Sequence, residues 1–254
     1  MKSDGAGLMK FSVVIPAFNE GKHIESAVMA VRAQVLESGD SVEIIVVDNN
    51  SSDHTHSAAT MALGGSGKVV FEEMPGPNFA RQRGFLESKG DVICFLDSDC
   101  MVPVDWIKNI RLEIEKGAKA VSGPYYYGFS AGYKAVLNKL YSWVVLPALP
   151  VLLRAVFWRK AAVIIGGNFA VTREALHTIG GIPPISFWGD DAVIGMMLVR
   201  MAGKVTFSRK VWTRTSPRRF DETGFWKVNF QYTLAYFRAF FAKDLSRFKD
   251  SSAT

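Results

Sequence analysis

The chain has 254 residues, of which 48% are hydrophobic, and a formal net charge of +6 at pH 7. This length fits one large domain or two small ones and is enough to bury a substantial core. A membrane-spanning protein is not expected, because the longest uncharged apolar stretch, Leu140 to Leu153, is too short to cross a bilayer and contains Pro147 and Pro150.

The N-terminal ten residues are polar and glycine-rich, so we expect no signal peptide. The two cysteines, Cys94 and Cys100, show neither metal-site spacing nor a disulfide framework, which favours a reducing compartment and a cytoplasmic protein. Between Asp191 and Asp221 there are lysines and arginines but no acid. Such a block suits an anionic substrate or an anionic membrane surface, although a solvated basic face is its commoner meaning.

Strands and helices alternate through the first half of the chain. Apolar runs predict strands at residues 10–16, 42–48, 67–73 and 92–96, of which the first, second and fourth are expected to be buried. Helical spacing or cap residues predict helices at 23–37, after 51–53, and at 78–90. This pattern is typical of an α/β fold with a parallel sheet covered by helices on both faces.

Polar residues follow three of the predicted strands. They are Asn19 and Glu20, then Asp48, then the pair Asp97 and Asp99. Since ligands bind at the carboxyl ends of strands in such sheets, we expect these three groups to meet on one rim.

The second half is less regular. Residues 161–176 are interpreted as a strand, a glycine break and the start of a helix, and Asp190 and Asp191 begin another helix. The segment Leu140 to Leu153 is expected to form a buried or interfacial helix pair, and Phe225 to Phe241 carries aromatic residues at helical spacing.

Several motifs together resemble family 2 of the inverting glycosyltransferases, which have the GT-A fold. They are "VVIPAFNE", "EIIVVDNNSSDHT", "NFARQRG" with Gln82 for the usual Asn, "DVICFLDSDC", "GGNFAVTREAL" and "GDDAVIGMMLVRMAGKV" with Asp190 for the customary Glu. Each motif is weak alone, but six in the order and spacing of the family are specific. The resemblance implies a GT-A domain over residues 1–220, a mostly parallel sheet flanked by helices, and a C-terminal helical extension over 221–254.

The resemblance also implies a metal site. Asp99 would bind Mn²⁺ or Mg²⁺ directly, and Asp97 would act through water or near the ribose. Both cations prefer oxygen ligands and stabilise the charge that develops on a departing diphosphate. The alternative is two solvated acids after a strand.

The same resemblance implies a donor site for a nucleotide-diphosphate sugar of the UDP or GDP type. Asp48 would bind the nucleobase, unless it is a helix N-cap or turn residue. Arg81 would hold the base or the diphosphate, unless it is a solvated helix arginine, and Arg218 and Arg219 would clamp phosphate, unless they form a solvent-facing turn. The remaining residues expected in this site are Pro16, Ala17, Asn19, Glu20 and Ser98.

Asp191 is the predicted catalytic base, with Asp190 raising its pKa or orienting it. Inversion requires the acceptor hydroxyl to lose its proton as it attacks opposite the leaving diphosphate, and a carboxylate in reach can accept that proton. The alternative is that both acids merely favour the positive end of the following helix.

The acceptor is expected to be a sugar or a lipid-linked molecule, in glycan or cell-envelope synthesis, and no nucleic-acid partner is expected. The apolar stretch 140–153 and the aromatic tail, each with nearby basic residues, would suit peripheral attachment to the inner face of the cytoplasmic membrane. Equally, these aromatics could cover an edge of the sheet. The rival functions are a catalytically inactive nucleotide-sugar-binding partner protein and a sugar nucleotidyltransferase.

Overall fold

The computed structural model describes residues 7–128, 133–185, 189–216, 218 and 225–245. Its strands are β1 (Lys10–Ala17), β2 (Ser41–Asp48), β3 (Gly67–Phe71), β4 (Val92–Leu96), β5 (Ala120–Ser122), β6 (Tyr125–Tyr127), β7 (Asn168–Thr172), β8 (Val205–Phe207) and β9 (Thr213–Thr215). Its helices are α1 (Ile24–Arg32), α2 (Thr55–Leu63), α3 (Pro77–Glu87), α4 (Trp106–Glu115), α5 (Tyr133–Leu140), α6 (Leu146–Phe157), α7 (Arg173–Ile179), α8 (Asp190–Met197) and α10 (Phe225–Phe241), with π-helical segments η1 (Tyr141–Val145) and η2 (Leu198–Ala202).

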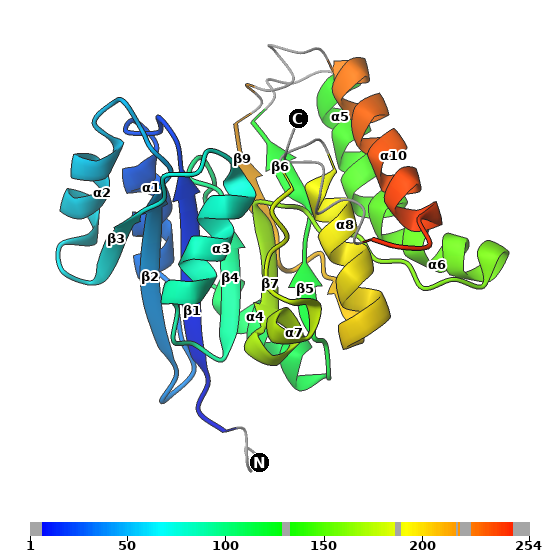
Figure 1. Ribbon diagram of the computed structural model, residues 1–254, viewed down its shortest axis with the longest axis horizontal. Coiled ribbons are helices and arrows are strands. Elements are labelled where there is room, and N and C mark those ends of the chain that lie inside the picture. The colour runs from blue at the N-terminus through cyan, green and yellow to red at the C-terminus, as the bar shows by residue number, and fades with distance from the viewer. Residues whose placement is uncertain (1–6, 129–132, 186–188, 217, 219–224, 246–254) are drawn as a thin grey trace.

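Seven strands form one mixed sheet in the order β3-β2-β1-β4-β7-β5-β8 (Figure 1). β7 is antiparallel to both of its neighbours, and the other pairs are parallel. The four predicted parallel strands are therefore confirmed. Strands β6 and β9 pair separately as a parallel ribbon.

Helices cover both faces of the sheet, as the continuous apolar strands predict. Along β1, Val13 and Ile15 pack with the buried faces of α1, α2 and α4, whereas Val14 faces α3 and the cluster that includes α7, α8 and α10. In Figure 1, α3, α7 and α8 lie in front of the sheet, and α10 stands beside α5 at its far end.

Two segments differ from the sequence prediction. The first helix ends at Arg32, because Gln34 and Val35 instead donate hydrogen bonds to the backbone carbonyls of Pro103 and Val104 before α4. In residues 161–176 the strand follows the glycine pair instead of preceding it, since it is Asn168–Thr172 that pairs with β4 and β5.

The apolar segment 140–153 lies in one run of helix instead of a proline-broken pair. Pro147 falls in the first turn of α6, where a missing N–H is tolerated, and the π-helical segment η1 directly precedes it. The carbonyl of Trp143, four residues before Pro147, accepts a hydrogen bond from Arg209 Nη2 at 2.5 Å. None of the helices in the described ranges is long and apolar enough to cross a membrane.

The C-terminal helix α10 packs on α8. Tyr236 and Phe240 are buried in the same apolar cluster as Phe95 of β4, while Phe230 and Phe241 are exposed. The aromatic residues of this helix thus serve both the core and the surface. The expected boundary at 220/221 lies outside the described residues, so the division into two units stays a prediction.

Candidate active site

A cleft of about 810 Å³ opens at the edge of the sheet where β1 and β4 end. The antiparallel β7 brings its amino end to this same edge, since Asn168 pairs with Leu96. The predicted residues that line the cleft are Pro16, Ala17, Glu20, Arg81, Asp97, Ser98, Asp99, Asp190, Asp191 and Arg218.

The two acids that follow β4 have different surroundings. Asp97 accepts hydrogen bonds from Arg81 Nη2 at 3.0 Å and from the Tyr125 hydroxyl at 3.3 Å. Asp99 has weaker contacts, from the Thr215 hydroxyl at 3.3 Å and the Cys100 thiol at 3.6 Å. Burial, and then the charges of Asp97 and Glu20, raise the pKa of Asp99. A carboxylate in such negative surroundings is well suited to bind a cation.

The two acids that begin α8 also differ. Asp190 forms an ion pair with Arg81 Nη1 at 3.3 Å. Asp191 accepts a hydrogen bond from the backbone N–H of Ala192 at 2.8 Å, and burial together with the charge of Asp190 raises its pKa to about 7. A carboxyl group with that pKa can accept a proton near neutral pH.

Arg81 connects these two pairs of acids. Its side chain is buried, and its guanidinium contacts Asp97, Asp190 and the amide oxygen of Asn78, the last at 2.9 Å. Asn78 in turn donates to the carbonyl of Ile185 at 2.9 Å, which fixes the segment that leads towards α8. A planar guanidinium can satisfy several acceptors at once, whereas an ammonium group would not span them.

Two glycines allow the chain to pass close to this cluster. A Cβ on Gly167 would lie 2.0 Å from an Asp97 carboxylate oxygen and 2.2 Å from the Tyr125 hydroxyl. Gly189, which precedes α8, has φ +104, and a Cβ there would lie 2.3 Å from Ala235 of α10. Both acid pairs therefore depend on a neighbouring glycine for their position.

An ion pair joins Glu20, in the loop after β1, to Arg218, which follows β9. Arg218 Nη2 lies 2.6 Å from Glu20 Oε1, while the other oxygen of Glu20 is buried without a hydrogen-bond partner among the described residues. Arg218 is half-exposed whereas Glu20 is largely buried, so a move of Arg218 to another anion would leave Glu20 as a buried carboxylate that needs a proton or a cation. Arg219 lies outside the described residues.

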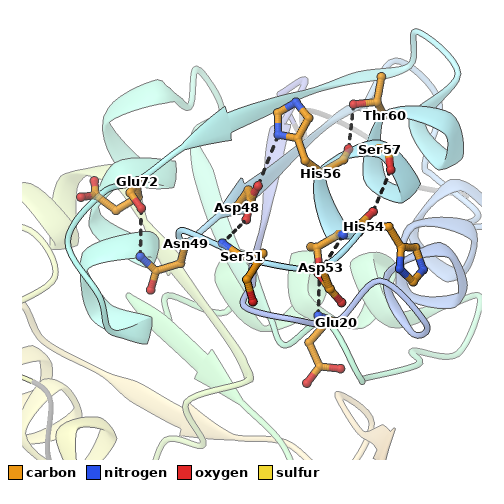
Figure 2. A network of polar contacts seen from close by, with 12 residues as sticks. Glu20, Asp48, Asn49, Ser51, Asp53, His54, His56, Ser57, Thr60 and Glu72 are labelled. Carbon is orange, nitrogen blue, oxygen red and sulfur yellow. Dashed lines mark hydrogen bonds and ion pairs between the residues drawn. The ribbon is translucent and has the colours of Figure 1, made fainter.

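Asp48 and Asn19 hold the loops beside the cleft and are absent from its described lining. Asp48 accepts from the Ser51 N–H at 3.1 Å and lies 3.3 Å from His56 Nδ1 (Figure 2). Asn19 accepts from the Ser52 N–H at 2.8 Å. Asn19 therefore joins the loop after β1 to the loop after β2, whereas Asp48 holds the loop after β2 and the start of α2. The predicted contact of both residues with the nucleotide stays a prediction.

The sequence model of glycosyl transferase family 2 matches residues 12–180, which is more than half of the chain. The chain belongs to glycosyl transferase family 2. The family that the motifs predict is thereby confirmed.

Curated relatives within this family are similar over part of their length. Glycosyltransferase AglE of Haloferax volcanii is 32% identical over 115 residues, which are 44% of this chain and 35% of that protein. Probable glycosyltransferase YdaM of Bacillus subtilis is 27% identical over 266 residues, covering 93% of this chain and 59% of that protein. The chain thus spans about one third to three fifths of the length of these two relatives.

Solved structures share the fold. The mannosyltransferase PcManGT from Pyrobaculum calidifontis, in complex with GDP-Man and Mn²⁺, superposes with a TM-score of 0.64 at 20% identity, covering 82% of this chain and 57% of that one. Glucosyl-3-phosphoglycerate synthase from Mycobacterium tuberculosis, in complex with Mn²⁺, UDP-glucose and phosphoglyceric acid, gives 0.61 at 22% identity, with coverages of 93% and 81%. The mixed sheet with a C-terminal helix is therefore GT-A-like.

The structure also assigns roles to residues that departed from the family pattern or were not predicted. Gln82, in place of the usual Asn, accepts a hydrogen bond from the Ile182 N–H at 2.8 Å and holds the loop after α7. The cleft is also lined by Tyr125, Tyr141 and Tyr236. These tyrosines lie in aromatic stretches of the sequence that match no motif, so the sequence gives no reason to place them in a site. Asn168, beside the glycine pair, accepts from Trp106 Nε1 at 3.0 Å and donates to the carbonyls of Gly123 and Val211.

Proposed function

We propose that the protein transfers a sugar, with inversion, from a nucleotide-diphosphate sugar to a hydroxyl or phosphate acceptor in glycan or cell-envelope synthesis. The observation that supports this is the bridge through Arg81, which joins Asp97 to Asp190. Their neighbours Asp99 and Asp191, both with raised pKa values, line the same cleft. One acid can serve the departing diphosphate while the other serves the attacking acceptor.

Asp99, with Asp97, would hold Mn²⁺ or Mg²⁺. The described residues contain no group of three His, Cys, Asp or Glu side chains arranged as a metal site. One or two carboxylates suffice when the donor phosphates complete the coordination, and the bound cation then neutralises charge on the diphosphate. Solved neighbours contain Mn²⁺ with GDP-Man or with UDP-glucose, and another contains Mg²⁺ with UDP.

The donor nucleotide would lie over the ends of β1 and β4. Pro16, Ala17 and Ser98 line the cleft there, and Asp48 is the acceptor proposed for an N–H of uracil or guanine. Arg218 would leave Glu20 for the diphosphate, because a guanidinium binds phosphate bidentately.

Asp191 would act as general base for a hydroxyl acceptor. The acceptor oxygen attacks the anomeric carbon, its proton passes to Asp191, and the bond from that carbon to the diphosphate oxygen breaks on the opposite face. Burial, and then the charge of Asp190, raise the pKa of Asp191 towards the working range. Attack opposite the leaving group inverts the configuration.

An exposed apolar face supports a lipid-linked acceptor and peripheral membrane attachment. Val151, Leu152, Val156 and Trp158 are each more than half exposed on or directly after α6, beside exposed Arg154. Rings at headgroup depth with cations against anionic lipid are typical of interfacial segments. A relative in Pseudomonas aeruginosa, 30% identical over 112 residues (42% of this chain, 32% of that protein), is named an undecaprenyl-phosphate 4-deoxy-4-formamido-L-arabinose transferase.

Trp158 allows this attachment to be tested. It has φ 55 and its side chain is 92% exposed, so Trp158→Gly should relieve backbone strain without losing packing. We expect the variant to be at least as stable as the wild type but to co-sediment less with vesicles that contain anionic lipid. If wild-type protein stays in the supernatant at both low and high salt, membrane attachment is wrong.

The proposed transferase function is tested by thermal shift with UDP, GDP and their sugars, with and without Mn²⁺, followed by nucleotide-release assays with the donors that bind. Ligands that bind the native state raise its melting temperature. Asp99→Asn should remove the metal-dependent shift and turnover, whereas Asp105→Asn, an exposed acid outside the cleft, should change neither. Binding without turnover would favour the inactive partner protein, and synthesis of a nucleotide sugar from a sugar phosphate would favour a nucleotidyltransferase.

A further inference from the structure

Two helical segments contribute apolar and aromatic side chains to the lining of the cleft, together with the polar residues Asn229 and Thr233 of α10. Val145, Leu146 and Leu149 come from η1 and α6, and Val228, Tyr236 and Phe237 come from α10. Figure 1 shows α10 standing beside the α5 end of that helical run. We call these six residues the apolar branch. Such walls offer few hydrogen bonds to a sugar ring but remove hydrocarbon from water.

One polar group in this branch lacks a partner. Tyr236 lines the cleft and is only 9% exposed. Its hydroxyl is buried and makes no hydrogen bond among the described residues. A buried hydroxyl left unpaired costs free energy, so a phenylalanine would be more stable there. Tyr141 lies nearby: its hydroxyl contacts Thr233, and its pKa is raised first by burial and then by the charge of Asp191.

Charge in the cleft disfavours an anion in this branch. Arg81 and Arg218 are the basic residues of the described lining, and they are paired with Asp97, Asp190 and Glu20. The basic run from 200 to 219 is partly used elsewhere, because Arg200 donates to the carbonyls of Phe240 and Ala242 at the end of α10. Asp191 would repel a phosphate, and a phosphate dianion needs no general base.

We propose that the acceptor is an uncharged amphiphile, with an alcohol at Asp191 and Tyr236 and an alkyl or isoprenoid body in the apolar branch. This rests on the proposed transferase function and names its substrate class. The Tyr236 hydroxyl donates to an oxygen of the acceptor and selects a polar head, while the apolar walls select the chain. The exposed face of α6 continues outward from the same helix and would receive the amphiphile from a lipid surface.

The experiment measures binding of methyl β-glucoside, octyl β-glucoside and monooctyl phosphate by calorimetry, all below their micellar concentrations and with the nucleotide and Mn²⁺ present. We expect octyl β-glucoside to bind at least tenfold more tightly than the methyl compound, since each buried methylene adds to affinity. It should also bind more tightly than monooctyl phosphate. Equal binding of the two glucosides, or a preference for the phosphate, would overturn the proposal.

Two adjacent valines provide a matched control. Val144 and Val145 are 50% and 42% exposed, but Val145 lines the cleft and Val144 does not. Val145→Asp should reduce octyl β-glucoside affinity at least tenfold, and Val144→Asp should leave it within twofold. Equal losses in both variants would indicate nonspecific adsorption and would contradict the assignment.

Tyr236→Phe separates binding from structure. We expect several-fold weaker binding of octyl β-glucoside with an unchanged or higher melting temperature. Unchanged affinity would contradict the role of the hydroxyl. Nucleotide binding is measured in parallel: if no nucleotide or nucleotide sugar binds but the octyl selectivity persists, the transferase function fails and the apolar branch stands, whereas donor turnover without octyl selectivity overturns the branch alone.

Discussion

The acids at the end of β4 and those at the start of α8 form two pairs built on one pattern. In each, one carboxylate is neutralised by Arg81 and the other is left without a strong counter-charge. The pairs differ in what surrounds the second acid. Burial raises the pKa of both second acids, but Asp99 has two acidic neighbours, Asp97 and Glu20, whereas Asp191 has Asp190 as its acidic neighbour and lines the same cleft as the apolar branch.

This difference separates two kinds of chemistry with the same side chain. Two negative neighbours favour binding of a cation, while burial with one negative neighbour favours a carboxyl group that exchanges a proton near neutral pH. The buried Arg81 fixes the position of one acid pair relative to the other, because it is bonded to the first acid of each pair.

Arg81→Met should have the largest effect, since it leaves two carboxylates without their counter-charge. We expect a loss of about 3–5 kcal/mol in the free energy of unfolding, because one partner of a buried ion pair is removed. Turnover should fall to background. Urea unfolding and nucleotide release measure the two effects.

Arg83→Met on the same helix is the control, because Arg83 is exposed and pairs with Glu87 one turn away. It should cost no more than about 0.5 kcal/mol. If both variants unfold at the same urea concentration, Arg81 does not hold the two acid pairs together.

Asp191→Asn should lower kcat by about a hundredfold or more with little change in nucleotide binding, since the amide keeps the shape but accepts no proton. In the wild type, kcat/KM should rise with pH through about 7, where Asp191 loses its proton. A rate that is independent of pH between 5 and 8, or a variant with normal kcat, would show that Asp191 is not the base.

Asp191 should also make stability depend on pH. Its pKa in the folded protein is raised, so the folded state binds more protons than the unfolded state between about pH 4 and 7. This contribution to stability is complete at low pH and is lost as the pH rises through about 7. Asp191→Asn should therefore stabilise the protein relative to wild type at pH 8 and not at pH 4, by urea unfolding.

Gly167→Ala should have an intermediate effect. The new methyl group would overlap the carboxylate of Asp97 and the hydroxyl of Tyr125, so the chain or both side chains must move. Overpacking of this kind costs about 1–3 kcal/mol, and metal-dependent nucleotide binding should weaken with it. Gly7→Ala is the control because its added Cβ has no atom within 4 Å. Equal metal dependence in both variants would show that Asp97 tolerates the shift.

The sequence predicts the part of the cleft at the ends of β1 and β4 better than the part lined by α10. Four strands and the polar residues that follow three of them are predicted by local patterns, because the chain alternates regularly up to Leu96. Tyr236 could not be assigned to the cleft, since its surroundings depend on how α10 packs on α8 from a distant part of the chain. The direction of β7 was equally hidden, because antiparallel pairing with β4 leaves no local signal in "NFAVT".

Arg81 shows the limit for single residues. Its position in "NFARQRG" marks it as a family motif, but the choice between a ligand contact and a solvated side chain was left open. The structure contradicts the solvated alternative, since Arg81 is buried and bonded to two acids that lie 16 and 109 residues away in sequence, and its contact with the nucleotide stays a prediction. Long-range ion pairs of this kind cannot be read from spacing.

The smallest effect is expected at His56, whose contact with Asp48 lies beside the cleft (Figure 2). The histidine side chain is 60% exposed and Asp48 is buried, so His56→Gln should change stability by less than about 0.5 kcal/mol. Asp48→Asn is the matched variant, because Asp48 also accepts the Ser51 N–H and is proposed to bind the nucleobase. It should weaken UDP or GDP binding about tenfold, measured by thermal shift and calorimetry, while His56→Gln changes it by less than twofold. If His56→Gln weakens binding as strongly as Asp48→Asn, the two side chains act on the nucleotide as one unit, and the assignment of nucleobase recognition to Asp48 alone is wrong.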